Sequence, residues 1–398
     1  MKRRSSHASV RIGIPAMAAL LALSSGSAVA APATQGVTAT EIVAGSTADL
    51  SGVTAVQGVN NSNAVRMVFD DANAQGGVNG RKIRLIVEDM QYQVPHAVQA
   101  INKLLNLDHV FFTVVDGGTP MNNAEMPMQF QKNVPNLFPL TAARSMYEPY
   151  NRLKFAQFAS YYDQMRSGVK YFVEQRHVSH LCAMYQDTDF GRDVLQGVQA
   201  EAKALGMQVV ATTAHQPTDT NFSADLTKLR DAGCDWVGVG TIVRDSIDIV
   251  SQAKKMGWTV PFVGQSASYD TAIATAPGDV GEGFYSMSPS IYAYADDPRP
   301  AVREFFAEYK KRFGIDPNFL GETGYSAAHM VLLGLQNAGQ DLTVDSLIKG
   351  LESIHSYTDI FGTTYSFGPN QHHGETSSYL SVVHKGRWVP VQTEALGY

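Results

Sequence analysis

Cysteine is scarce in this chain: its 398 residues include only Cys182 and Cys234. A chain of this length with so few cysteines does not depend on a disulfide framework for its stability. Cys182 falls in an apolar, strand-like run and Cys234 at the start of another. We therefore expect two buried thiols. A bridge is the alternative, if the strands bring the two Cα atoms to within about 7 Å of each other.

Basic clusters are absent beyond Arg11, and the formal net charge is −6. Long apolar runs are missing too. The run Ile12–Leu23 is shorter than the roughly 20 residues that a membrane-spanning helix needs. It follows a basic start and precedes the small residues Ala28-Val29-Ala30, a pattern typical of a cleaved signal peptide over residues 1–30. We expect a secreted chain that has no stable membrane insertion, binds no nucleic acid and has small molecules or proteins as partners.

Catalytic motifs are missing as well. The sequence has no zinc-protease, phosphate-loop or intact dinucleotide-binding motif. Gly264-Gln265-Ser266 resembles the start of a nucleophile elbow, but Ser268 occupies the place of the final glycine. No nucleophile and base can be assembled elsewhere, so we expect a protein that is not an enzyme, with no metal and no cofactor.

What the sequence has instead is regular alternation of short strand-like runs with amphipathic stretches of helical period. The strand-like runs 41–49, 82–89 and 109–115 are separated by helical patterns over 57–75 and 94–107. Such alternation is typical of βαβ units and parallel sheets. The same pattern restarts with a helix at 162–177, and the mature chain exceeds the roughly 250–300 residues at which one core stops growing.

The fold class that follows is α/β, with two doubly wound parallel-sheet lobes joined by a multi-strand hinge. Three late helical patterns, over 300–313, 321–338 and 343–353, need a sheet to cover, and the first lobe is short of helices. We therefore expect the chain to return to the first lobe. The expected N-terminal lobe comprises 37–158 plus 289–364, and the C-terminal lobe comprises 159–288 plus 365–398.

Ligands of open α/β sheets bind beyond the carboxyl ends of the strands, where helix N-termini present free N–H groups. The loop Asp116-Gly117-Gly118-Thr119 follows such a strand, with Thr119 expected as a helix N-cap and Pro120 as the first helical residue. This loop would suit a carboxylate, although an ordinary capped turn explains it about as well. Three further loops of this kind are 185–191, 241–246 and 264–269.

The chain resembles the leucine/isoleucine/valine-binding family of type I periplasmic binding proteins, the receptors of ABC importers. The resemblance covers essentially the whole mature chain. Its most specific carrier is the run NAQGGVNGRK over 73–82, supported by Asp49-Leu50-Ser51-Gly52, by Val134-Pro135 leading into 138–141, and by Tyr185-Gln186-Asp187 with Phe190-Gly191.

The resemblance implies a cleft between the lobes, in which a ligand carboxylate meets Gly117–Thr119 and the Thr141 hydroxyl while aromatic side chains cover the rest of the ligand. The expected ligand-binding residues are Ser51, Gln57, Asp116, Gly117, Gly118, Thr119, Thr141, Tyr162, Tyr185, Asp187, Phe190, Thr241, Arg244, Ser266 and Tyr269. Near Ser266, amino-acid-binding members tend to carry an acidic residue for the ligand ammonium, and this chain does not. Either Asp116 or Asp187 replaces it, or the ligand has no ammonium.

By this resemblance we expect a periplasmic receptor that closes over a small ligand and is recognised by an ABC permease in the inner membrane. The ligand is either an aliphatic amino acid or an aromatic or aliphatic carboxylate or amide. A sensor that signals to a regulatory partner is the alternative function, and a secreted hydrolase is a third.

Overall fold

The computed structural model describes residues 1, 5–9 and 34–398, so the predicted signal peptide over residues 1–30 lies almost entirely outside the described residues. Residues 34–398 form one compact unit. Among the described residues, no helix combines the length and the apolar character needed to cross a bilayer.

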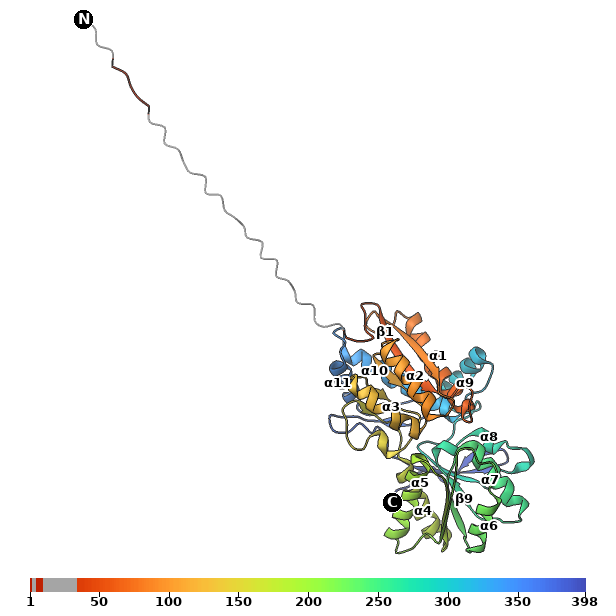
Figure 1. Cartoon of the computed structure of the whole chain (residues 1–398). Helices are drawn as coiled ribbons and strands as arrows, with labels where there is room; N and C mark the ends of the chain where they lie inside the picture. The colour runs from red at the N-terminus through yellow and green to blue at the C-terminus, as the bar shows by residue number, and fades with distance from the viewer. Residues whose placement is uncertain (2–4, 10–33) are drawn as a thin grey trace. The chain divides into compact units, whose positions relative to one another are not determined.

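The first half of the chain forms a five-stranded sheet in the order β2-β1-β3-β4-β5, and all its strand pairs are parallel. Figure 1 shows α1, α2 and α3 beside β1. The strands are β1 Glu41–Ala48, β2 Lys82–Asp89, β3 Phe112–Val114, β4 Asn136–Leu137 and β5 Lys154–Phe155, and the helices are α1 Ala55–Ala74, α2 Val94–Asn106 and α3 Thr119–Gln131, followed by a 3-10 turn, η1, at Arg144–Met146.

A second, seven-stranded sheet has the order β14-β13-β10-β9-β8-β6-β7. Its core strands are parallel, and β13 and β14 extend it with antiparallel pairs. Figure 1 shows α4, α5, α6 and α7 around β9. The strands are β6 Leu181–Gln186, β7 Ala211–His215, β8 Trp236–Gly240, β9 Phe262–Gly264, β10 Tyr285–Ser288, β13 Tyr379–His384 and β14 Arg387–Pro390, and the helices are α4 Tyr161–Arg176, α5 Asp189–Ala204, α6 Ser223–Asp231, α7 Val243–Lys255 and α8 Thr271–Ala274, with 3-10 turns η2 Ser266–Ser268 and η3 Pro277–Asp279.

Of the three late helices, the first packs against α1 and the other two share a hydrophobic core with the first sheet. The three helices are α9 Pro300–Phe313, α10 Phe319–Ala338 and α11 Val344–Glu352, followed by a small hairpin of β11 Tyr357–Thr358 and β12 Thr364–Tyr365. Ala327 and Val331 of α10 share one core with Val65 and Val68 of α1. The helices approach closely at Gly324, where an added Cβ would lie 2.7 Å from the Asn61 carbonyl oxygen. The α/β architecture with two parallel-dominated sheets is therefore confirmed, and the exact lobe boundaries stay a prediction.

The expectation of two free thiols is wrong. Cys182 and Cys234 form a disulfide with a Cα–Cα distance of 5.9 Å. Strand β6 lies between β7 and β8 and pairs with both. Cys182 of β6 is opposite Val237 of β8, and Cys234 lies just before β8. This strand order brings the two cysteines together, and the periodicity of the sequence does not reveal it.

Candidate ligand-binding site

A pocket lies beyond the carboxyl ends of the strands and takes residues from the loops of both sheets. It contains about 790 Å³ of space free of protein atoms, counting the part open to solvent. From the first sheet it takes Asp49, Gln57, Met90, Tyr92, Gly117–Thr119 and Thr141. From the second it takes Phe190, Ile242, Val243, Ser266 and Ala267, together with Phe158, Tyr161, Phe319 and Leu320 from the connecting segments.

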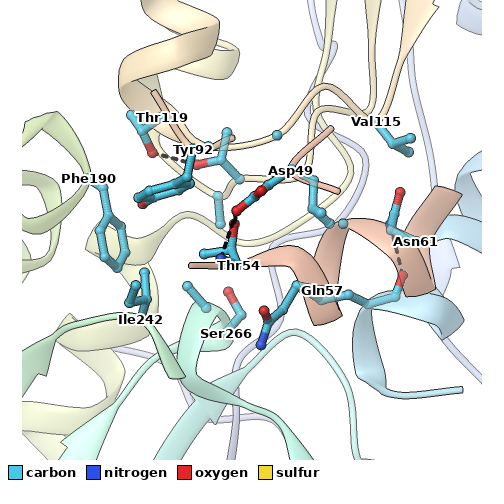
Figure 2. Close-up of a pocket in the computed structure, with 18 of the residues that line it drawn as sticks. Asp49, Thr54, Gln57, Asn61, Tyr92, Val115, Thr119, Phe190, Ile242 and Ser266 are labelled. Atoms are coloured by element: carbon cyan, nitrogen blue, oxygen red, sulfur yellow. Dashed lines mark hydrogen bonds between the residues drawn. The ribbon is translucent and has the colours of Figure 1, made fainter. Parts of the chain in front are cut away.

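The loop between β3 and α3 presents hydroxyl and amide groups to this pocket. Gly118 adopts φ 73°, a conformation that favours glycine, and it is the N-cap of α3. Thr119 is therefore the first helical residue rather than the expected N-cap, and its hydroxyl lies 2.6 Å from the Thr141 hydroxyl (Figure 2). Because the first amides of a helix have no acceptor within the helix, the start of α3 offers hydrogen-bond donors to an anion.

Asp116 lies in the same loop but its carboxylate is directed into the protein. It is 1% exposed and accepts hydrogen bonds from the Thr47 amide at 2.9 Å, Gln129 Nε2 at 2.9 Å and Asn136 Nδ2 at 3.3 Å. Burial raises the pKa of Asp116 to about 6. Burial, with the nearby Asp116, also raises the pKa of Glu125, which accepts the Thr47 hydroxyl. Asp116 therefore supports the loop from beneath and does not line the pocket.

Neutral aromatic rings form one wall of the pocket. The rings of Tyr161 and Phe190 meet edge to face with 5.0 Å between centroids, and Tyr92 lies close to Thr119 and Phe190 (Figure 2). Burial raises the pKa values of Tyr92 and Tyr161, so both phenols are uncharged at neutral pH. The wall suits an apolar or aromatic ligand body.

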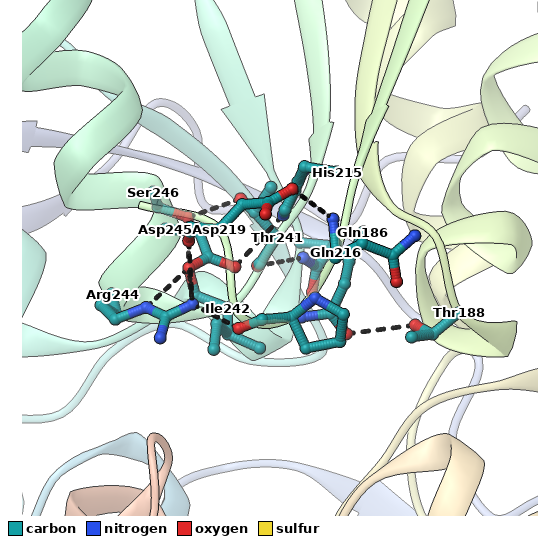
Figure 3. A network of polar contacts seen from close by, with 12 residues as sticks. Gln186, Thr188, His215, Gln216, Asp219, Thr241, Ile242, Arg244, Asp245 and Ser246 are labelled. Atoms are coloured by element: carbon teal, nitrogen blue, oxygen red, sulfur yellow. Dashed lines mark hydrogen bonds and ion pairs between the residues drawn. The ribbon is translucent and has the colours of Figure 1, made fainter. Parts of the chain in front are cut away.

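Arg244, which was expected to bind the ligand from a second-sheet loop, pairs with a residue of the protein instead. Arg244 donates to Asp245 at 2.6 and 2.8 Å and to the Pro217 carbonyl at 2.7 Å. Asp245 is fully buried and also contacts His215 Nε2 at 3.2 Å (Figure 3). This network anchors the start of α7, so the apolar Ile242 and Val243 reach the pocket while Arg244 does not.

Several other expected residues are held by partners outside the pocket. Asp187 pairs with Arg192 at 2.7 Å, and the Tyr162 ring lies 3.9 Å below the Arg144 guanidinium. Tyr269 is buried, with its hydroxyl 2.9 Å from Ser381 Oγ, and Ser51 donates to Asp89 at 2.6 Å. Of the expected residues, the pocket is lined by Gln57, Gly117, Gly118, Thr119, Thr141, Phe190 and Ser266, and it is not lined by Ser51, Asp116, Tyr162, Tyr185, Asp187, Thr241, Arg244 or Tyr269.

Sequence reasoning missed Tyr92, Tyr161 and Phe319. Tyr92 could have been found, because it follows the strand-like run 82–89 and so lies at the same sheet edge as the Gly117–Thr119 loop. Tyr161 and Phe319 begin helices that connect or cover the two sheets, and no local signal marks such positions.

The pocket holds no free charge among the residues that line it. Asp49 is its one acidic lining residue, and its oxygens accept from the amides of Gly52 and Thr54 and from the Thr54 hydroxyl. No lining residue is Lys, Arg or His. Nearby Asp270 lies outside the lining; it is buried and accepts Asn318 Nδ2 at 2.7 Å and Gln57 Nε2 at 3.5 Å.

Two parallel sheets that contribute loops to one pocket define a two-lobed ligand-binding fold. A family model described as periplasmic binding protein matches residues 41–387, and the chain therefore belongs to that family. The resemblance to the leucine/isoleucine/valine-binding proteins and the type I fold are confirmed.

Three known proteins are similar to this chain. A leucine-, isoleucine-, valine-, threonine- and alanine-binding protein of Pseudomonas aeruginosa is 22% identical over 276 residues, covering 69% of this chain and 72% of that protein. A fatty acid ABC transporter substrate-binding protein from Thermomonospora curvata has a TM-score of 0.82 at 23% identity, covering 92% and 94% of the two chains. A solute-binding protein of R. palustris in complex with benzoate has a TM-score of 0.79 at 16% identity, covering 90% and 97%.

Proposed function

We propose that this protein is a periplasmic receptor that binds a small carboxylate without an ammonium group and delivers it to an ABC permease. The observation that carries this proposal is a pocket with hydroxyl and amide donors at one end, aromatic rings along its side and no free carboxylate. Nothing in this arrangement supplies a nucleophile with an adjacent base, so the proposed role is binding and not catalysis.

The carboxylate of the ligand would meet the start of α3. The Thr119 and Thr141 hydroxyls lie 2.6 Å apart and can both turn toward an anion. The amides of the first helical turn add donors and a favourable dipole. Hydrogen bonds to a charged group contribute about 1.5–3 kcal/mol each, so this end of the pocket would orient the ligand.

An amino acid would also bring an ammonium group, and the pocket has no acid left for it. The Asp49 carboxylate accepts hydrogen bonds from its own loop, and the Asp116 carboxylate is directed into the protein. The Asp270 carboxylate accepts hydrogen bonds from the side-chain amides of Asn318 and Gln57. Burying an unpaired ammonium is strongly unfavourable. We therefore favour an aromatic or branched aliphatic acid. Benzoate, named for the R. palustris protein, and the fatty acid named for the T. curvata protein are carboxylates without an ammonium group, whereas the ligands named for the P. aeruginosa protein are amino acids.

Ligand capture would proceed by closure of the two lobes. Contacts already join elements of the two lobes: Asn123 of α3 donates to Asp189 of α5 at 2.8 Å, and Arg144 pairs with Asp193 at 2.7 Å. A ligand that touches both lobes would favour this closed arrangement, which is the form that a permease would recognise.

A thermal-shift screen with matched ligand pairs tests the proposal. 3-Phenylpropanoate is compared with phenylalanine, phenylacetate with phenylglycine, and 4-methylvalerate with leucine, because the members of each pair differ only by the ammonium group. We expect the acids to raise the Tm and the amino acids to leave it unchanged. Stabilisation by leucine but not by 4-methylvalerate would refute the ammonium-free ligand. Turnover of a bound ligand would refute the non-enzymatic role.

A further inference from the structure

A second, smaller cavity lies where chain segments pass between the two sheets, and it shares Phe158 with the ligand pocket. It is bounded by Phe158, which precedes α4, by Pro289 and Ser290, which follow β10, and by the hairpin residues Asp359 and Thr363. About 10 Å³ is open to the centre of a water-sized particle, which is room for one water molecule or one ion.

Glu322 of α10 lines this cavity, and its side chain is buried there without a hydrogen-bond partner among the described residues. The residue is 2% exposed, and neither carboxylate oxygen has a hydrogen-bond partner among the described residues. Burial raises the pKa of Glu322 well above its usual value, and nearby Asp359 raises it further. An unpaired buried carboxylate is costly, so something must compensate it.

The groups around Glu322 already have other partners. Asp359 accepts from the Ser326 hydroxyl at 2.6 Å and from the amides of Phe361 and Thr363 at 3.0 and 2.9 Å. Arg299 is the nearby cation, and it pairs with Asp297 at 2.6 Å and donates to the Phe361 carbonyl. The effects of Arg299 and of the Ala293 amide on the pKa of Glu322 are smaller than the effect of burial. The cavity therefore contains two carboxyl groups, of which Glu322 is unpartnered, and is lined by oxygen-bearing side chains, including Thr323, Ser326 and Thr363.

We propose that this cavity is a binding site for one alkali cation, sodium or potassium, held by the two free oxygens of Glu322 with hydroxyl or carbonyl oxygens around it. Hard cations prefer oxygen ligands. A single charge matches the site better than a divalent ion, because Asp359 already has four hydrogen-bond donors and only Glu322 is free. The site lies between segments that connect the sheets, so the ion stabilises the joint between the lobes.

Thermal unfolding without organic ligand tests the site. The protein is melted in sodium, potassium or choline chloride at equal ionic strength, above the raised pKa of Glu322. We expect the Tm in sodium or potassium to exceed that in choline by about 2–4 °C. The variant Glu322→Gln keeps the shape and removes the charge, so its Tm should not depend on the cation.

Glu125→Gln is the matched control. Glu125 is also a buried glutamate with one unpartnered oxygen, but it lies beneath the ligand loop. This variant should keep the full cation dependence. Should Glu322→Gln fail to fold, anomalous scattering from crystals soaked in thallium(I) shows whether an ion lies beside the Glu322 carboxylate. Equal Tm values of the wild type in all three salts, or equal responses of both variants, would overturn the proposal.

Discussion

The disulfide offers a test that separates the stability of the second-sheet region from ligand binding. The bridge joins residues that are 52 positions apart. Closing a loop of that length lowers the entropy of the unfolded chain by about 14 cal/mol/K, which corresponds to about 4 kcal/mol of folding stability at 25 °C. Reduction of the wild-type protein with dithiothreitol should therefore lower its free energy of unfolding by about 4 kcal/mol, with both side chains still present.

Urea unfolding followed by tryptophan fluorescence is a suitable assay, because Trp236, Trp258 and Trp388 all belong to the second-sheet region. The double variant Cys182→Ala/Cys234→Ala should lose at least as much stability, since it also removes buried sulfur. The cysteines lie at the amino ends of β6 and β8, opposite the pocket residues that follow β8. The ligand Kd should therefore not change. A stability loss below about 1 kcal/mol would refute the entropy argument, and a weakened Kd would refute the separation of bridge and pocket.

Three further predictions concern the pocket and its support. Thr119→Val should weaken binding of a carboxylate by about 10- to 100-fold in titration calorimetry. The control is Thr213→Val, because Thr213 lies in β7 and its buried hydroxyl has no hydrogen-bond partner, so this variant should bind normally. Equal affinities of the two variants would show that the anion binds elsewhere. The folded-state pKa of Asp116, about 6, lies above its unfolded value, so its contribution favours the folded state at low pH and is lost as pH rises from about 4 to about 6. Between pH 4 and pH 6 the free energy of unfolding of Asp116→Asn should therefore fall by about 3 kcal/mol less than that of the wild type. An equal fall in both proteins would contradict this. Arg144→Met should weaken ligand binding by about 5- to 20-fold because it removes a half-buried contact to Asp193 across the sheets. Arg192→Met loses only exposed contacts, to Asp187 and Asp189 within its own lobe, and should bind normally.

Much of the fold could be predicted because hydrophobic period depends on local sequence. The helical pattern over 94–107 agrees with α2 at Val94–Asn106. Strand β4 is only two residues long, because Phe138 adopts φ 53° and ends the extended backbone after Leu137. The two-residue strand β5 was missed, since a run of that length carries no periodicity. Strand order, and with it the disulfide, depends on pairing between distant segments.

The site could be predicted only in part, and most of the residues that were predicted correctly are uncharged. The glycines and threonines of the first-sheet loops line the pocket, because their position follows directly from the strand that precedes them. The expected charged residues Asp116, Asp187 and Arg244 do not line it. Each has a partner within the protein whose position depends on the tertiary structure, and no sequence pattern distinguishes such a charge from a free one.

This difference bears on ligand selection. A loop at the carboxyl end of a strand must satisfy its own backbone amides, and a carboxylate is an effective acceptor for them, as Asp49 and Asp116 show. Once these acids accept protein donors, they cannot also neutralise a ligand cation without leaving the loop amides unsatisfied. Recognition of an ammonium group would therefore require a new acidic residue at a pocket position where its carboxylate is not needed as an acceptor for backbone amides. Ser266 is such a position, because it lines the pocket and its hydroxyl accepts only a side-chain amide, that of Gln164. On this reasoning Ser266→Asp should shift preference from 4-methylvalerate toward leucine, and a variant that binds neither better than the wild type would show that the excluded charge is not what sets specificity.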